Sequence, residues 1–213
     1  MDSCKSQGRE TDWSPIASKT SEGIEKALKV VKNGGIVVFP TDTVYGIGCD
    51  PYNKKSIDII YQIKERPKSK PFPLLVYSMD VASEIVEMDK NSKKIAERFW
   101  PGPLTLILKL KDEQLKKSLN LEDKIAIRIP ENQCLLDLLK DCKLLVGTSA
   151  NISGENSFTN SQECFQKIQD FDIFLDGGDI KNGLESTILE MNQGKPIFHR
   201  IGALKKEEII ESI

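Results

Sequence analysis

The sequence is poor in the residues that usually build metal centres and catalytic triads. It has five cysteines, none in a CxxC pair, and a single histidine, His199. This composition provides neither a zinc-ligand pattern nor a disulfide framework, so we expect reduced and mostly buried thiols. It also leaves little material for a serine or cysteine triad. We interpret His199 as structural, because no neighbouring residue completes an acid–base pair with it.

Long apolar runs are also missing. The longest, residues 36–39 and 104–108, are far shorter than the roughly 20 residues that a membrane-spanning helix needs. Residues 1–13 lack the apolar stretch of a signal peptide. The sequence therefore predicts a cytoplasmic protein without membrane contact. It also predicts a flexible polar segment over residues 1–20 and one domain over residues 21–213.

An excess of positive charge is absent as well. Lysine and arginine number 30 against 32 aspartates and glutamates, which gives a formal net charge of −2. Proteins that hold the nucleic-acid backbone usually carry an obvious basic excess, so the composition argues mildly against a dedicated nucleic-acid binder. A local anion site is still allowed, because attraction depends on which residues converge. A nucleotide-binding enzyme fits this composition.

Helical and strand patterns alternate along the chain, which predicts an α/β domain with a largely mixed sheet. No internal repeat or linker divides it. The expected helices cover residues 21–32, 54–63, 80–88, 91–99, 133–140, 161–168 and 205–213, with Asn33-Gly34-Gly35 ending the first. The expected strands cover residues 36–39, 74–77, 104–110, 124–129 and 144–147, and lie near 173–175, 185–190 and 196–200.

The common phosphate-binding motifs are absent. The chain has no GxxxxGK[ST] loop, and Gly46-Ile47-Gly48 lacks the third glycine of a dinucleotide fingerprint. A GxSxG elbow is missing too. A phosphate site in this chain would therefore be assembled from polar clusters at strand ends and loops, where functional groups are usually held.

Residues 64–71 form a basic cluster. Pro67 disfavours helical backbone at Arg66, and in an extended segment Lys64 and Arg66 project to the same side. With Lys68 they would suit a polyphosphate, arginine as a bidentate fork and lysine as a mobile point charge. The alternative is a solvated basic loop.

Three further polar clusters cover residues 40–46, 147–154, and 185–188 together with 199–202. The hydroxyls and amides of 147–154 could cradle phosphate or ribose oxygens. Ordinary turn chemistry is the alternative there and at 40–46. Arg128 lies inside an apolar strand pattern. A buried arginine rarely lacks an anionic partner, so we expect a carboxylate or phosphate beside it.

Taken in order, these clusters resemble the YrdC-like family of threonylcarbamoyl-AMP synthases, in its single-domain form without the C-terminal extension. The matching segments run from about residue 21 to 203 and read FPTDTVYGIGCD, KERPKSKPFPLLV, WPGPLTLIL, IAIRIP, GTSANISG, ESTILE and HRIGA. The resemblance implies an open, twisted mixed sheet with flanking helices and a deep cleft. It also implies a nucleotidyltransferase that joins L-threonine, bicarbonate and ATP into threonylcarbamoyl-AMP and pyrophosphate, for modification of the tRNA adenosine next to the anticodon.

The resemblance also assigns residues. Catalysis falls to Lys64 and Arg66, and the nucleotide contacts are Lys64, Arg66, Lys68, Ser149, Asn151, Ser157 and Arg200. The threonine contacts are Thr41, Arg128, Gly147 and Ser186. Mg²⁺ would be carried by the ATP phosphates with no protein metal site, and tRNA or double-stranded RNA and a downstream threonylcarbamoyl transferase are the implied partners.

Other readings of the same residues remain open. The cleft could serve a non-catalytic protein that binds double-stranded RNA or tRNA, with Lys64, Arg66, Lys68, Lys70 and Arg200 contacting phosphates. Carbamoyl-adenylate chemistry with another acceptor, as in hydrogenase-maturation carbamoyltransferases, would require acylphosphatase-like and zinc-finger segments that this sequence lacks. A sugar-phosphate lyase would require a carboxylate-rich metal site, and the sequence shows none.

Overall fold

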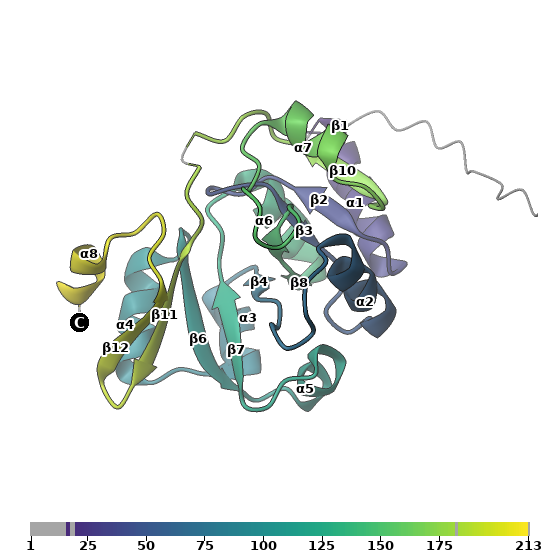
Figure 1. Cartoon of the computed structure of the whole chain (residues 1–213). Helices are drawn as coiled ribbons and strands as arrows, with labels where there is room; N and C mark the ends of the chain where they lie inside the picture. The colour runs from purple at the N-terminus through teal and green to yellow at the C-terminus, as the bar shows by residue number, and fades with distance from the viewer. Residues whose placement is uncertain (1–15, 18–19, 182, 213) are drawn as a thin grey trace, which may run out of the picture.

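The chain folds into strands and helices that alternate along most of its length (Figure 1). The structure, a computed structural model, describes residues 16–17, 20–181 and 183–212. Within them, the helices are α1 (Ser21–Lys32), α2 (Lys54–Ile63), α3 (Met79–Ile85), α4 (Lys90–Phe99), α5 (Glu113–Leu119), α6 (Gln133–Cys142), α7 (Ser161–Lys167) and α8 (Lys206–Ile210). Side-chain caps begin most of them; Thr20, for example, accepts a hydrogen bond from Gly23 at the start of α1.

The described strands form two mixed sheets rather than one. The five-stranded sheet has the order β1 (Ile16–Ala17), β10 (Ile173–Asp176), β2 (Val37–Phe39), β3 (Gly46–Gly48) and β9 (Thr148–Ser149). The seven-stranded sheet has the order β12 (Lys195–Arg200), β11 (Thr187–Asn192), β6 (Leu104–Leu110), β7 (Lys124–Arg128), β4 (Leu74–Val76) and β8 (Leu144–Val146), with β5 (Val86–Glu87) paired to β6. Parallel and antiparallel pairs occur in both sheets, so the predicted mixed α/β class is confirmed.

Gly147 is the point where the chain passes from one sheet to the other. It separates β8, which pairs with β4, from β9, which pairs with β3. The sheets are tied together here, because Val146 N donates to Cys49 O at 2.9 Å. A Cβ on Gly48 would lie 1.9 Å from the oxygen of Val146, so only glycine fits this junction. The junction between the two sheets therefore fixes the position at which the loop after Gly147 begins.

Two apolar cores support this frame. Helices α1 and α6 pack against each other and contact strands β2, β8 and β10, which buries Ala27, Phe39, Leu138 and Leu145. A larger core joins the seven-stranded sheet to α2, α3 and α4, and contains Ile60, Leu74, Ile95 and Leu106. The apolar residues that the sequence predicts to be buried in strands and helices therefore pack together in these two cores.

The structure corrects several of the expected elements. Strands β1, β3 and β9 and helix α5 were not predicted. The helix expected over residues 80–88 ends at Ile85, because Val86 pairs with Leu110 as strand β5. Helix α8 is shorter than the predicted 205–213. The flexible segment predicted for residues 1–20 falls largely outside the described residues and stays a prediction.

Candidate active site

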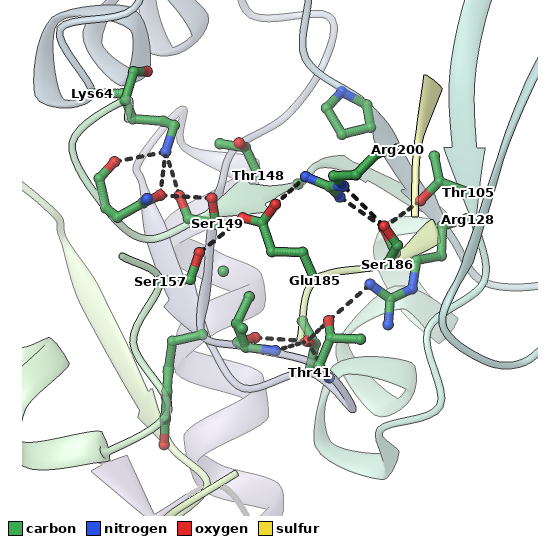
Figure 2. A pocket seen from close by; sticks show the side chains of 18 of the residues that line it. Thr41, Lys64, Thr105, Arg128, Thr148, Ser149, Ser157, Glu185, Ser186 and Arg200 are labelled. Carbon is green, nitrogen blue, oxygen red and sulfur yellow. Dashed lines mark hydrogen bonds and ion pairs between the residues drawn. The ribbon is translucent and has the colours of Figure 1, made fainter. Parts of the chain in front are cut away.

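A cavity of about 560 Å³ opens where the two sheets meet (Figure 2). Its walls come from the β2–β3 turn, the segment after α2, the loop after Gly147, and the segment that precedes β11. The cavity contains every predicted nucleotide or threonine contact except Lys68. Those lining residues are Thr41, Lys64, Arg66, Arg128, Gly147, Ser149, Asn151, Ser157, Ser186 and Arg200. Chain topology therefore brings together clusters that are distant in the sequence.

Lys64 is buried at the C-terminal end of α2. Its Nζ donates to the main-chain oxygens of Ser149 and Asn151 and to Asn151 Oδ1 at 3.0 Å. Burial, reinforced by the charge of Arg66 and opposed by Glu185, lowers the pKa of Lys64 to about 8. Because an ammonium has three N–H groups, this residue fixes the loop around Ser149 and Asn151 with all of them.

Arg66 lies at the cavity wall and braces the basic loop. Its Nε donates to Lys70 O at 2.8 Å and its Nη2 to Pro71 O at 3.2 Å, while the guanidinium lies 5.3 Å from the Phe72 ring centroid. The expected extended run from Lys64 to Arg66 was wrong. Lys64 has right-handed helical backbone and Glu65 a φ of 48°.

Lys68 lies away from the cavity lining. It is exposed and forms an ion pair with Asp58 at 2.6 Å, whereas Lys70 lines the cavity. An exposed ion pair of this kind is weak, so Lys68 could still reorient toward a ligand. Its assignment as a nucleotide contact stays a prediction.

Ser149, Asn151, Ser157 and Arg200 all present hydrogen-bonding groups in the cavity lining. Ser149 Oγ donates to Asn151 Oδ1 at 2.6 Å, and Asn151 Nδ2 donates to Glu155 O at 2.6 Å. The Arg200 guanidinium donates from Nε to Ser186 O at 2.9 Å and from Nη2 to Ser186 Oγ at 3.2 Å. These groups are held in position before any ligand binds.

Glu185 lines the cavity but was not among the predicted contact residues. Its carboxylate accepts from Ser157 Oγ at 2.8 Å and pairs with Arg200 Nη1. Burial tends to raise the pKa of Glu185, but the charge of Arg200 and the hydrogen bond from Ser157 outweigh it and lower that pKa. Its place directly before Ser186, in the segment ESTILE, was the available signal.

Arg128 lies at the end of β7 on the other side of the cavity. It is buried, and donates to Gly102 O at 2.9 Å, to Thr43 Oγ1 at 3.0 Å and to the carboxylate of Asp42. The expectation that this strand arginine has an anionic partner is confirmed by the Asp42 ion pair. Gly102 belongs to the segment WPGP, whose backbone thus positions the guanidinium.

Thr41 and Ser186 complete the predicted threonine contacts. The Thr41 hydroxyl accepts from Val44 N at 3.1 Å and donates to Val44 O, so it stabilises the turn between β2 and β3. Ser186 Oγ lies 2.8 Å from Thr105 Oγ1. A Cβ on Gly147 would lie 2.4 Å from Leu75 Cδ1, which explains the glycine there by packing.

The described residues hold no group of three or more histidine, cysteine, aspartate or glutamate side chains that could bind a metal. His199 Nε2 lies 2.9 Å from Glu190 Oε2 on an exposed strand and is not part of the cavity lining. Among the helices of the part that the structure describes, none has the length and apolar character needed to cross a membrane.

Family comparison agrees with this geometry. The family model for Sua5, YciO and YrdC, described as telomere recombination, matches residues 29–202. The chain belongs to the Sua5/YciO/YrdC family. The matched range contains every wall of the cavity, so the site is built from the part that defines the family.

Several relatives of this chain have names that contain threonylcarbamoyl-AMP synthase. The threonylcarbamoyl-AMP synthase of Pyrococcus abyssi is 31% identical over 87% of this chain and 56% of its own length. A putative threonylcarbamoyl-AMP synthase of Methanocaldococcus jannaschii is 34% identical over 87% of this chain and 88% of its own. The crystal structure of P. abyssi Sua5 complexed with L-threonine superimposes with a TM-score of 0.84 at 30% identity, covering 95% of this chain and 61% of that one.

The chain spans little more than half the length of some curated relatives, including the P. abyssi protein at 56% and the Bacillus subtilis threonylcarbamoyl-AMP synthase at 55%. The activity and partners of those longer proteins are therefore proposals for this chain. Escherichia coli YciO, at 23% identity and a TM-score of 0.77, supports the fold alone.

Proposed function

We propose that this chain is a threonylcarbamoyl-AMP synthase, which joins L-threonine, bicarbonate and ATP. One observation carries the proposal. A single cavity collects Lys64, Arg66 and Arg200 near a loop of hydroxyls and amides, with Arg128 also in its lining. Such a cavity offers cationic and polar groups for a polyphosphate and a buried cation for an amino-acid carboxylate. The names of the relatives and the threonine complex of P. abyssi Sua5 point the same way.

The proposed reaction has two steps. The threonine amine and bicarbonate first form a carbamate with loss of water. A carbamate oxygen then attacks the α-phosphorus of ATP, the bond to the β-phosphate oxygen breaks, and pyrophosphate leaves. Such a nucleotidyl transfer depends mainly on alignment and on neutralising developing charge, and needs no covalent nucleophile.

The residues that line the cavity suit these two reaction steps. Ser149, Asn151 and Ser157 would bind nucleotide oxygens, and Arg66 and Arg200 would neutralise charge on the phosphates. Arg128, Thr41 and Ser186 would hold threonine near Gly147. Mg²⁺ would arrive on the ATP phosphates, and the product would go to a downstream threonylcarbamoyl transferase for tRNA. A cytoplasmic location and direct contact with tRNA remain predictions.

The decisive experiment measures pyrophosphate release from ATP with Mg²⁺ across a panel of free amino acids. Release that requires both threonine and bicarbonate would support the synthase. Release with neither, or with another amino acid, would contradict the proposed substrate. Salt-sensitive RNA binding without ATP turnover would instead favour the RNA-binding alternative.

A further inference from the structure

Glu185 places a carboxylate among the very groups that are proposed to bind phosphate. It accepts a hydrogen bond from Ser157 Oγ at 2.8 Å and forms an ion pair with Arg200 Nη1. Figure 2 shows Glu185 between Ser157 on one side and Arg200 on the other. The remaining described contacts of Arg200 go to Ser186, so its Nη1 is the nitrogen directed at Glu185.

A phosphate oxygen and this carboxylate compete for the same donors. A serine hydroxyl carries one hydrogen, so Ser157 Oγ can donate to Glu185 or to a phosphate, but not to both. Glu185 is charged at neutral pH, because its surroundings lower its pKa. The Glu185 side chain is 31% exposed to solvent, so it has room to rotate away from Arg200.

We infer that Glu185 is an internal competitor that sets the affinity of the cavity for polyphosphate. In the ligand-free protein its carboxylate takes the place of a phosphate group on Ser157 and Arg200. Nucleotide binding displaces it, and its return favours departure of pyrophosphate. This inference rests on the proposed function, since it takes the Ser157–Arg200 side of the cavity as the phosphate side.

The test is isothermal titration of ATP and of inorganic pyrophosphate into the parent protein and Glu185→Gln. Glutamine keeps the shape and an acceptor for Ser157 but removes the charge that holds Arg200. We expect both ligands to bind at least about fivefold more tightly to the variant, because a charged competitor is removed from a half-exposed site. Pyrophosphate should also become a stronger product inhibitor.

Glu155→Gln is the matched control. Glu155 lines the same cavity and is exposed, and within the described part of the chain its carboxylate makes no hydrogen bond or ion pair. This variant removes the same charge without freeing a donor, so its gain in affinity should be clearly smaller. An equal gain would attribute the effect to net charge and overturn the competitor role.

The outcomes separate the inference from the proposed function. If the parent binds ATP and Glu185→Gln binds it equally or more weakly, Glu185 positions Arg200 and Ser157 instead, and only the inference fails. If neither protein binds ATP or pyrophosphate, both fail. Glu185→Ala provides a second variant should the glutamine change disturb folding, and a gain in affinity cannot arise from damage to the fold.

Discussion

Lys64 Nζ lies 2.7 Å from the main-chain oxygen of Asn151, which follows it by 87 residues. With the contacts to Ser149 O and Asn151 Oδ1, this ties the end of α2 to the loop after β9. The ammonium has no N–H group to spare for a ligand in this arrangement. Lys64 therefore shapes the proposed nucleotide side of the cavity through the loop that it anchors.

Replacing Lys64 should loosen this loop. In Lys64→Met three oxygen acceptors lose the hydrogen bond from the ammonium, and Asn151 O is the one for which no other donor is described, so we expect the free energy of unfolding to fall by about 1–3 kcal/mol. ATP binding should weaken as well. Urea unfolding measures the first effect and calorimetry the second. Lys55→Met, an exposed lysine of the same helix, should change stability by less than about 0.5 kcal/mol. A Lys64→Met protein as stable as the parent would refute the anchoring role.

ATP binding should depend on pH near the pKa of Lys64. Burial lowers that pKa to about 8, so the side chain is charged below this pH and neutral above it. The neutral amine has two N–H groups for three acceptors and no charge for the phosphates, so affinity should fall as pH rises through about 8. Because Glu185 raises the pKa of Lys64, Glu185→Gln should shift the fall to lower pH. The same pH profile in both proteins would argue against Lys64 as the titrating group.

Much of the fold could be predicted from the sequence, because long apolar patterns report burial directly. The strand over Leu104–Leu110 and the helix over Lys54–Ile63 have the predicted bounds. Strands β3 and β9 are three and two residues long and contain glycine or hydroxyl residues, so they carry no periodic signal. Their pairing depends on strands from distant parts of the chain.

Most of the residues that form the site could be predicted from the sequence, but the hydrogen bonds and ion pairs that connect them could not. An arginine in an apolar strand predicts a carboxylate, and Asp42 supplies it. Charge and the family resemblance together made Lys64 a predicted nucleotide contact, whereas its partners in the structure are oxygens 85 and 87 residues away. Glu185 escaped prediction because a carboxylate is not expected in an anion site. Such contacts follow from tertiary packing, which no local pattern encodes.

The buried pair of Arg128 and Asp42 should contribute to stability. Their side chains are 7% and 11% exposed, and Asp42 Oδ1 also accepts from Glu131 N at 3.0 Å. Asp42→Ala leaves a buried guanidinium without its counter-ion, so we expect a loss of about 3–5 kcal/mol in the free energy of unfolding. Adding Arg128→Met should cost less than the sum of the two changes, because the unpaired charge is then gone. Additive losses in denaturant unfolding would show that the two residues act independently.

Arg66 should matter for chemistry more than for folding. Arg66→Ala removes a charge at the cavity wall, and we expect adenylate formation to fall by about 10²–10³. Arg66→Lys should not restore adenylate formation, because lysine lacks the guanidinium that donates to both Lys70 O and Pro71 O. Arg98→Ala is the matched control, since Arg98 is exposed on α4 and lies 5.4 Å from the Phe99 ring centroid. Pyrophosphate release and thermal unfolding, measured together, separate activity from stability; activity within a few-fold of the parent would eliminate the role.

Lys68 and Lys70 allow a direct test of whether the family resemblance or the cavity lining better identifies the lysine that contacts ATP. The family resemblance assigns a nucleotide contact to Lys68, but the cavity is lined by Lys70, while Lys68 pairs with Asp58. We expect Lys70→Ala to raise the Kd for ATP by about threefold, as suits one exposed charge, and Lys68→Ala to change it less. Calorimetry at low salt gives the comparison, and added salt should shrink the difference because exposed charges are screened. The reverse order would mean that Lys68 leaves Asp58 to reach the phosphates, and the loop over residues 66–72 would then rearrange on binding.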